Sequence, residues 1–253
     1  MRILCVENKD AAGFREFSLV WEKLPEEARV QWNGSWNEKD EPTWVLLECP
    51  TPKSLSQADF DAWKRRFPIS ALVAVQGSLC EGELTLNKPL GAHWVFWYDF
   101  LATLPREYEA GKLGRATVWA LPETAQRDAR VLADLERERR WPTPPRTKPL
   151  NVRIETDDFA QFALLRDFFQ REKGFQGGVS VIFEGEPEVL LFDFPDFRDA
   201  TRERFLRLRK DYPQAKPIAL LEFPRLEEWQ WCEANGASVF PKPFRWTDLR
   251  RAV

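Results

Sequence analysis

The stretch PEVLLFD at residues 187–193 ends a short apolar run in an aspartate, and PTWVLLE at residues 42–48 repeats the pattern with a glutamate. In both stretches the acidic residue stands six positions after a proline. A short, continuous apolar run predicts a strand that is buried on both faces of a sheet. The repetition therefore indicates two related halves, each with an acidic residue at the carboxyl end of a buried strand.

The sequence around these two stretches alternates predicted strands with predicted helices. Large apolar side chains recur three and four residues apart between the strands, and these amphipathic segments end at proline or glycine. Such alternation predicts a parallel sheet that is covered by helices on both faces. The strands are expected at residues 1–8, 28–32, 44–49, 71–75 and 94–100 in the first half, and at 152–154, 179–183, 189–192, 218–221 and 238–240 in the second.

A connecting region separates the two halves. Residues 117–121 are compatible with an extra strand, and residues 123–140 carry a narrow apolar stripe that predicts a helix. The segment WPTPPR at 141–146 is typical of a stiff, extended linker. We therefore predict one domain at 1–122, a helix and Pro-rich linker at 123–149, and a second domain at 150–253.

Composition excludes several classes of protein. The 253 residues are 43% hydrophobic and 30% charged, which is typical of a soluble globular protein. A net charge of −3 provides no basic field for nucleic acid, and no apolar run approaches the length of a membrane span. The first residues, MRIL, lead directly into a predicted strand, so we expect no signal peptide and a cytoplasmic location.

The four cysteines and the aromatic residues have simple interpretations. The cysteines show no CxxC spacing, and His93 is the sole histidine, so reduced thiols are favoured over a zinc site. The chain has 12 Trp and 19 Phe against one Met, and we expect most of these rings in the cores and at interfaces.

The order of these elements resembles the receiver domain of two-component response regulators, in two copies. The resemblance implies an α/β fold: two flavodoxin-like, doubly wound domains, each with a five-stranded parallel sheet in strand order 2-1-3-4-5. In that family, two acids after the first strand hold Mg²⁺, and an aspartate after the third strand accepts a phosphoryl group. A hydroxyl after the fourth strand and a lysine after the fifth respond to the added charge.

The second half retains part of this set. Asp193 falls at the phosphoacceptor position, and Lys242-Pro243-Phe244 matches the Lys-Pro-Phe that follows the fifth strand in the family. Glu222 occupies the hydroxyl position, where a carboxylate would repel a phosphoryl group.

The acidic pair of the second half is incomplete. Thr156 and Asp157 fall at its two positions, with Asp158 beside them. The resemblance therefore implies either no cofactor or Mg²⁺ held weakly by Asp157 and Asp158.

The first half has lost more of the pattern. Glu7 and Asn8 fall at the acidic pair, and Glu48 takes the acceptor position. Tyr98-Asp99-Phe100 stands where Lys-Pro-Phe is expected. The resemblance implies that this half cannot undergo aspartyl phosphorylation; Glu48 either mimics a permanently modified state or is a product of structural drift.

A loop of the first half offers a different kind of site. Cys49, Cys80, Glu81 and Glu83 are expected near the carboxyl edge of the first sheet. A thiol nucleophile there lacks a base, and carboxylates beside it would raise its pKa. A divalent cation held by the acids is the alternative to carboxylates that are simply solvated at the rim of a loop.

These patterns favour a non-catalytic signalling or scaffold protein, made of tandem pseudo-receiver domains, that binds protein partners and is compatible with a homodimer. The first alternative is a working Mg²⁺-dependent phosphoacceptor at Asp193. The second is a ligand-binding protein or enzyme that uses the loop at residues 77–83.

Overall fold

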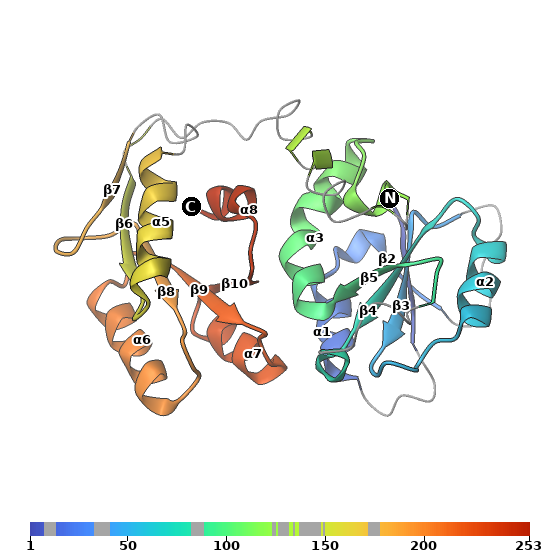
Figure 1. Ribbon diagram of the computed structural model, residues 1–253, viewed down its shortest axis with the longest axis horizontal. Helices are drawn as coiled ribbons and strands as arrows, with labels where there is room; N and C mark the ends of the chain where they lie inside the picture. Colours follow the sequence, from blue (N-terminus) through green and yellow to red (C-terminus); the bar gives the residue numbers. More distant parts are fainter. Residues whose placement is uncertain are drawn as a thin grey trace. The chain divides into compact units, whose positions relative to one another are not determined.

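A computed structural model describes residues 1–7, 14–32, 41–81, 89–122, 125, 132–133, 135–136, 148, 150–171 and 178–253. The chain divides into two compact units, Met1–Arg137 and Glu138–Val253 (Figure 1). Each unit contains one parallel sheet flanked by helices, so each is an α/β unit with its own core.

The first unit is built from strands and helices that follow one another along the chain. Among the described residues, single-turn 3₁₀ helices lie at Glu26–Ala28, Ser78–Cys80 and Val118–Ala120. The main elements are β1 (Ile3–Val6), α1 (Arg15–Lys23), β2 (Arg29–Gln31), β3 (Trp44–Cys49), α2 (Gln57–Arg66), β4 (Ala71–Gln76), β5 (His93–Phe96) and α3 (Trp97–Lys112).

The second unit repeats the order and has a described helix, α7, between its fourth and fifth strands. Its elements are β6 (Leu150–Glu155), α5 (Phe159–Arg171), β7 (Val179–Val181), β8 (Val189–Asp193), α6 (Asp199–Asp211), β9 (Lys216–Glu222), α7 (Leu226–Ala234), β10 (Ser238–Lys242) and α8 (Trp246–Ala252).

The two sheets have the same strand order. It is β2-β1-β3-β4-β5 in the first unit and β10-β9-β8-β6-β7 in the second, and every pair of neighbouring strands is parallel. Numbered within its own unit, each sheet therefore has the order 2-1-3-4-5. This is the order of flavodoxin-like receiver folds, and the predicted fold class is confirmed.

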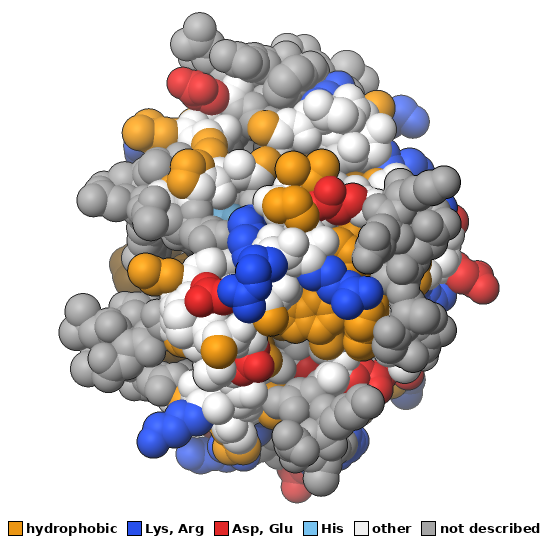
Figure 2. All heavy atoms as spheres, turned by 90° about the vertical axis from the view of Figure 1, so that its right-hand side faces the viewer, with side chains coloured by type: hydrophobic (Ala, Val, Ile, Leu, Met, Phe, Trp, Pro, Cys, Tyr) orange, Lys and Arg blue, Asp and Glu red, His pale blue; other side chains and the backbone are white. Residues whose placement is uncertain are grey.

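Helices cover both faces of the first sheet (Figure 1). On one face α2 buries Phe60 and Phe67 against β1, β3 and β4. On the other face lie α1 and α3, and Trp119 packs edge-on against Trp44 at 4.4 Å. Figure 2 shows hydrophobic and basic side chains gathered side by side on one face of the molecule.

The second sheet is covered in the same way. Leu165 and Phe169 of α5 and Leu249 of α8 pack on one face. On the other face, the ring of Phe205 in α6 lies 5.4 Å from Phe192 and 5.7 Å from Trp231 in α7. Aromatic side chains thus fill this core, as the composition predicts.

Three sequence predictions for residues 94–140 need comment. The strand expected at 94–100 is wrong beyond Phe96, because the aromatic run continues as α3 and buries Trp97, Phe100 and Leu101 at helical spacing. The extra strand at 117–121 is also wrong, since Val118–Ala120 is a 3₁₀ turn. Most of the helix predicted at 123–140 lies outside the described residues.

In the described part of the chain, no helix is both long enough and apolar enough to cross a membrane.

Candidate functional site at the carboxyl ends of the strands

The carboxylate of Asp193 is held on both sides in the second unit. It ends β8 and is 5% exposed. Its Oδ1 accepts a hydrogen bond from Lys242 Nζ at 2.8 Å, and its Oδ2 accepts one from Thr156 Oγ1 at 2.8 Å. Three predicted site residues therefore meet at one point, with a buried charge that is paired and hydrogen-bonded.

Parallel strands bring these residues together. Thr156 directly follows β6, Asp193 ends β8 and Lys242 ends β10, so all three lie at the carboxyl edge of the sheet. The peptide bond from Lys242 to Pro243 is cis. Thr156 Oγ1 also accepts a hydrogen bond from the backbone N–H of Asp158 at 3.1 Å, which ties the start of the next loop to the site.

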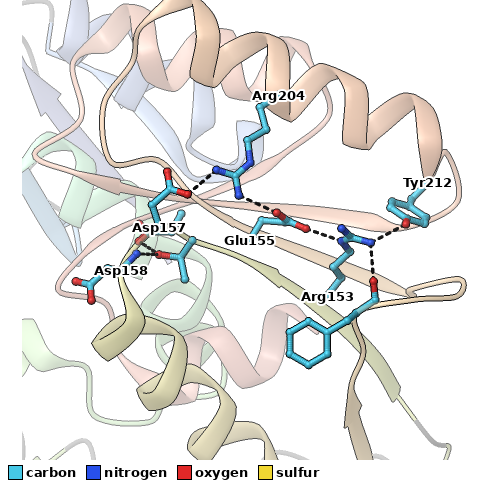
Figure 3. A network of polar contacts seen from close by, with 9 residues as sticks. Arg153, Glu155, Asp157, Asp158, Arg204 and Tyr212 are labelled. Atoms are coloured by element: carbon cyan, nitrogen blue, oxygen red, sulfur yellow. Dashed lines mark hydrogen bonds and ion pairs between the residues drawn. The ribbon is translucent and has the colours of Figure 1, made fainter.

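The two predicted metal ligands make other contacts (Figure 3). Asp157 Oδ1 accepts a hydrogen bond from Arg204 Nη1 of α6 at 2.7 Å. Asp158 Oδ1 accepts from the backbone N–H of Ala160 at 2.7 Å and of Gln161 at 3.2 Å, at the start of α5. Among the described residues, no three His, Cys, Asp or Glu side chains are grouped so that they could hold a metal ion.

Glu222 and Phe223 lie beside Lys242 at the carboxyl edge of the sheet. Glu222 ends β9, is exposed, and stands in register with Lys242. Phe223 has a φ of 45°, in the left-handed region that a bulky residue adopts at a cost, and its side chain is 54% exposed. The predicted hydroxyl position thus carries a carboxylate, followed by an exposed aromatic ring.

An apolar groove lies between α5 and α8, and we call it the α5–α8 groove. It consists of a hollow of about 440 Å³ and a second of about 300 Å³, which share Leu164 and Trp246. The larger hollow reaches the carboxyl edge of the sheet at Lys242 and Glu222. The groove is lined chiefly by Leu164, Phe168, Phe223, Lys242, Phe244 and Trp246.

The acceptor position of the first unit is buried. Glu48 lies within β3 and is 5% exposed. Glu7 accepts a hydrogen bond from Gln31 Nε2 at 3.1 Å, which directs its carboxylate to β2. Asn8 lies outside the described residues.

Strand register places a tryptophan where the second unit has its lysine. Glu48 pairs with Val75 and Val75 with Val95, as Asp193 pairs with Leu220 and Leu220 with Phe240. Two residues further on, Trp97 therefore corresponds to Lys242, one position earlier than the predicted Tyr98. Trp97 is fully buried and begins α3, so the first unit has neither an ammonium group nor a loop at this position.

Aromatic and small side chains fill this edge of the first unit. A Cβ atom at Gly77 would lie 2.6 Å from the ring of Phe14, so the ring touches the backbone there. The indole N–H of Trp97 donates to Ser78 Oγ at 3.3 Å, and that hydroxyl donates to Glu16 at 3.3 Å. A phosphoryl dianion would have to displace these packed groups, and the position of the lysine carries the apolar ring of Trp97.

The thiols near this edge are buried. Cys49 Sγ donates to the carbonyl oxygen of Thr51 at 3.4 Å, and Cys80 Sγ donates to that of Cys49 at 3.5 Å.

Burial, followed by the charges of Glu81 and Asp99, raises the pKa of Tyr98. Glu83, the last residue predicted for this loop site, lies outside the described residues.

The remaining thiols are buried as well. Cys5 and Cys232 have at most 1% of their surface exposed, and burial raises the pKa of both, to about 12 for Cys232. Such thiols are poor nucleophiles at neutral pH.

Sequence reasoning missed the basic side chains of the second site. Arg204 lies on α6, 47 residues from Asp157, and Arg153 lies on β6 beside Glu155. Charged residues on an amphipathic helix are typical of a solvated face, so the pattern gave no signal that Arg204 turns toward the sheet edge.

Comparisons with known proteins add little. No protein-family model matches the chain, and no curated protein matches it. A solved structure that does match is the solution structure of the E. coli RcsC C-terminus (residues 700–949), containing a linker region and a phosphoreceiver domain. The match covers 99% of this chain and 90% of that one, with 14% identity and a TM-score of 0.33, and we draw nothing from it.

Proposed function

We propose that this protein is a signalling or scaffold protein made of tandem pseudo-receiver domains, which acts by binding protein partners and not by phosphoryl transfer. The main support is that each sheet edge lacks one of the side chains that respond to phosphorylation in the receiver family. In the first unit the buried ring of Trp97 stands at the position of the lysine. In the second unit Glu222 stands at the position of the hydroxyl, in register with Lys242.

The electrostatics of the second unit support the same proposal. Asp193 already has hydrogen-bond donors on both of its oxygens. A phosphoryl group on Asp193 would bring about two negative charges to the edge that also carries Glu222. The ammonium group of Lys242 would then have to serve both carboxylates and the added group.

The α5–α8 groove supports the partner-binding part of the proposal. Leu164 and Phe223 are each 54% exposed, and both line its larger hollow. Exposed apolar side chains that line a groove are typical of a protein-binding surface, where a few aromatic and aliphatic anchors supply most of the affinity. We therefore place the partner at this groove.

The first prediction concerns phosphorylation. With Mg²⁺ and acetyl phosphate, we expect the purified wild-type protein to show no stoichiometric phosphoryl adduct by intact-mass spectrometry, because Glu222 at the same edge repels a phosphoryl group and Arg204 occupies Asp157. Asp193→Asn should give the same spectrum. One added phosphoryl group per chain that disappears in Asp193→Asn would contradict the non-catalytic proposal.

That contrary outcome would favour the second candidate function, a Mg²⁺-dependent phosphoacceptor at Asp193. The contacts of Asp193 with Lys242 Nζ and Thr156 Oγ1, both at 2.8 Å, favour this candidate. Beryllofluoride binding that is lost in Asp193→Asn would support it further, since beryllofluoride mimics a phosphoryl group on a carboxylate.

The second prediction concerns the groove. Leu164→Asp should weaken binding of a partner captured from cell extract by about 2 kcal/mol, or about 30-fold, because it places a charge in an apolar contact. The matched control is Leu206→Asp, since Leu206 is also an exposed helical leucine of the second unit, on α6. Equal binding by both variants, measured by biolayer interferometry, would remove the groove as the partner site.

A further inference from the structure

A guanidinium group stands beside the acidic loop of the second unit. Arg204 Nη1 donates to Asp157 Oδ1 at 2.7 Å, and Arg204 Nη2 donates to Glu155 Oε2 at 2.9 Å (Figure 3). Two nitrogens of one planar fork therefore bind two carboxylates of neighbouring residues. These hydrogen bonds, with Asp157 as the larger cause, raise the pKa of Arg204 above its already high value, so the group stays charged.

Further hydrogen bonds hold Glu155, the second partner of Arg204, in place. Glu155 also accepts a hydrogen bond from Arg153 Nε at 2.6 Å, and its side chain is 15% exposed. Arg153 Nη1 in turn donates to the hydroxyl of Tyr212 at 2.7 Å and to the carbonyl oxygen of Phe183 at 3.1 Å. The chain of contacts in Figure 3 thus fixes Glu155, and Glu155 fixes the fork of Arg204.

Several of the other oxygen atoms that a metal ion would use at this edge already accept hydrogen bonds. Asp158 caps the start of α5, and both oxygens of Asp193 accept hydrogen bonds. Mg²⁺ requires oxygen ligands in near-octahedral geometry and usually binds through one or two free carboxylates. The donor set that the fold family would use for Mg²⁺ therefore does not fit the ion in this arrangement.

Three of the carboxylates at this edge already have a basic side chain in contact with them. Glu155, Asp157 and Asp193 contribute three carboxylates, and each is in contact with a basic side chain. Those basic side chains are Arg153, Arg204 and Lys242. Asp158 and Glu222 add two more carboxylates, so the opposition to a divalent cation is local: at Asp157 the ion would meet the guanidinium of Arg204.

We propose that Arg204 is the resident cation of the second unit and takes the place of a divalent metal ion at Asp157. The inference concerns the same sheet edge as the proposed function, but a metal titration reads it out without any partner or phosphodonor. It predicts that the edge of the wild-type protein is organised in the absence of Mg²⁺, and that removing the guanidinium creates a metal site.

The test is a titration of MgCl₂ into Arg204→Gln by isothermal titration calorimetry. We expect wild type to show no saturable binding up to about 10 mM, and Arg204→Gln to bind one Mg²⁺ with a Kd of about 1 mM or lower, at least about tenfold below that limit, because Asp157 is released while Glu155 keeps Arg153. The acquired binding should disappear in the double variant Arg204→Gln/Asp157→Asn. Arg204→Lys keeps a positive charge and should not acquire the site.

Arg202→Gln is the matched control. Arg202 lies on the same helix with the same 36% side-chain exposure as Arg204, but it pairs with Asp199 of its own helix. It should behave as wild type in the titration. Saturable Mg²⁺ binding to wild type that Asp157→Asn abolishes would overturn the proposal, and so would a folded Arg204→Gln variant that acquires no binding. If Arg204→Gln fails to fold, Arg204→Met, which keeps the apolar stem and also lacks the guanidinium, takes its place in the titration with the same expected outcome.

Discussion

Replacing Lys242 with methionine is expected to lower the free energy of unfolding of the second unit by about 3 kcal/mol. Methionine keeps the apolar stem of the side chain but removes the ammonium group that lies 2.8 Å from Asp193. The Asp193 side chain is 6% exposed, so its charge would remain buried, and among the described residues the hydroxyl of Thr156 would be its remaining side-chain donor. Removing one partner of such a pair costs more than replacing both.

The measurement should report on the second unit alone, because a chain of two units need not unfold in one step. Hydrogen–deuterium exchange of peptides from β8 and β9 meets this need. The slowest amides should exchange about 100-fold faster in Lys242→Met, which corresponds to about 2.7 kcal/mol. The double variant Asp193→Asn/Lys242→Met should recover most of the protection.

Lys216→Met is the control for this prediction. Lys216 begins β9, in the same sheet as Lys242, and its side chain is exposed. Its loss should change protection by less than about 0.5 kcal/mol. If the double variant is as unstable as Lys242→Met, an unpaired buried charge at Asp193 is not the source of the lost stability.

The sequence was a good guide to the second unit because its signals are local. Five short apolar runs and the stops between them correspond to β6 to β10, and the order of polar residues at the strand ends placed Thr156, Asp193 and Lys242 at one edge. A parallel sheet converts that order into proximity without any knowledge of side-chain contacts. The contact between Asp157 and Arg204 has no such signal, because helix α6 must first pack on the sheet before the two side chains meet.

The first unit was harder to predict, for a reason that its aromatic residues explain. Residues 94–100 are apolar at nearly every position, and such a run is compatible with a buried strand or a buried helix. The structure divides it after Phe96, where β5 ends and α3 begins. That boundary decides whether the first unit has a loop at the lysine position, and periodicity alone does not locate it.

Replacing Arg106 with methionine is expected to lower the free energy of unfolding of the first unit by about 3–5 kcal/mol. Glu107 of α3 is completely buried, and its Oε1 accepts from Arg106 Nε at 3.0 Å. Its Oε2 accepts from the backbone N–H of Val118 at 2.8 Å. The carboxylate therefore ties α3 to the 3₁₀ turn at Val118–Ala120, and replacing Arg106 removes a cation in direct contact with this buried charge.

The structural consequence should appear beyond α3. The turn carries Trp119, whose ring stacks on Phe100 at 5.1 Å and meets Trp44 of β3 edge-on. If the buried charge expels this turn, Trp119 is exposed and the intrinsic fluorescence shifts to longer wavelength at urea concentrations that leave wild type folded. Lys112→Met, at the exposed last turn of the same helix, should change the free energy of unfolding by less than about 0.5 kcal/mol. Its emission wavelength should stay that of wild type.

The double variant Arg106→Met/Glu107→Gln separates charge from packing. A neutral glutamine still accepts from Val118 and leaves no charge in the core, so this variant should unfold at a urea concentration closer to wild type than Arg106→Met does. A double variant no more stable than Arg106→Met would show that the arginine contributes through its packing. In that case the turn would depend on its aromatic contacts, and Trp119→Ala should lower the free energy of unfolding at least as much as Arg106→Met does, by about 3–5 kcal/mol.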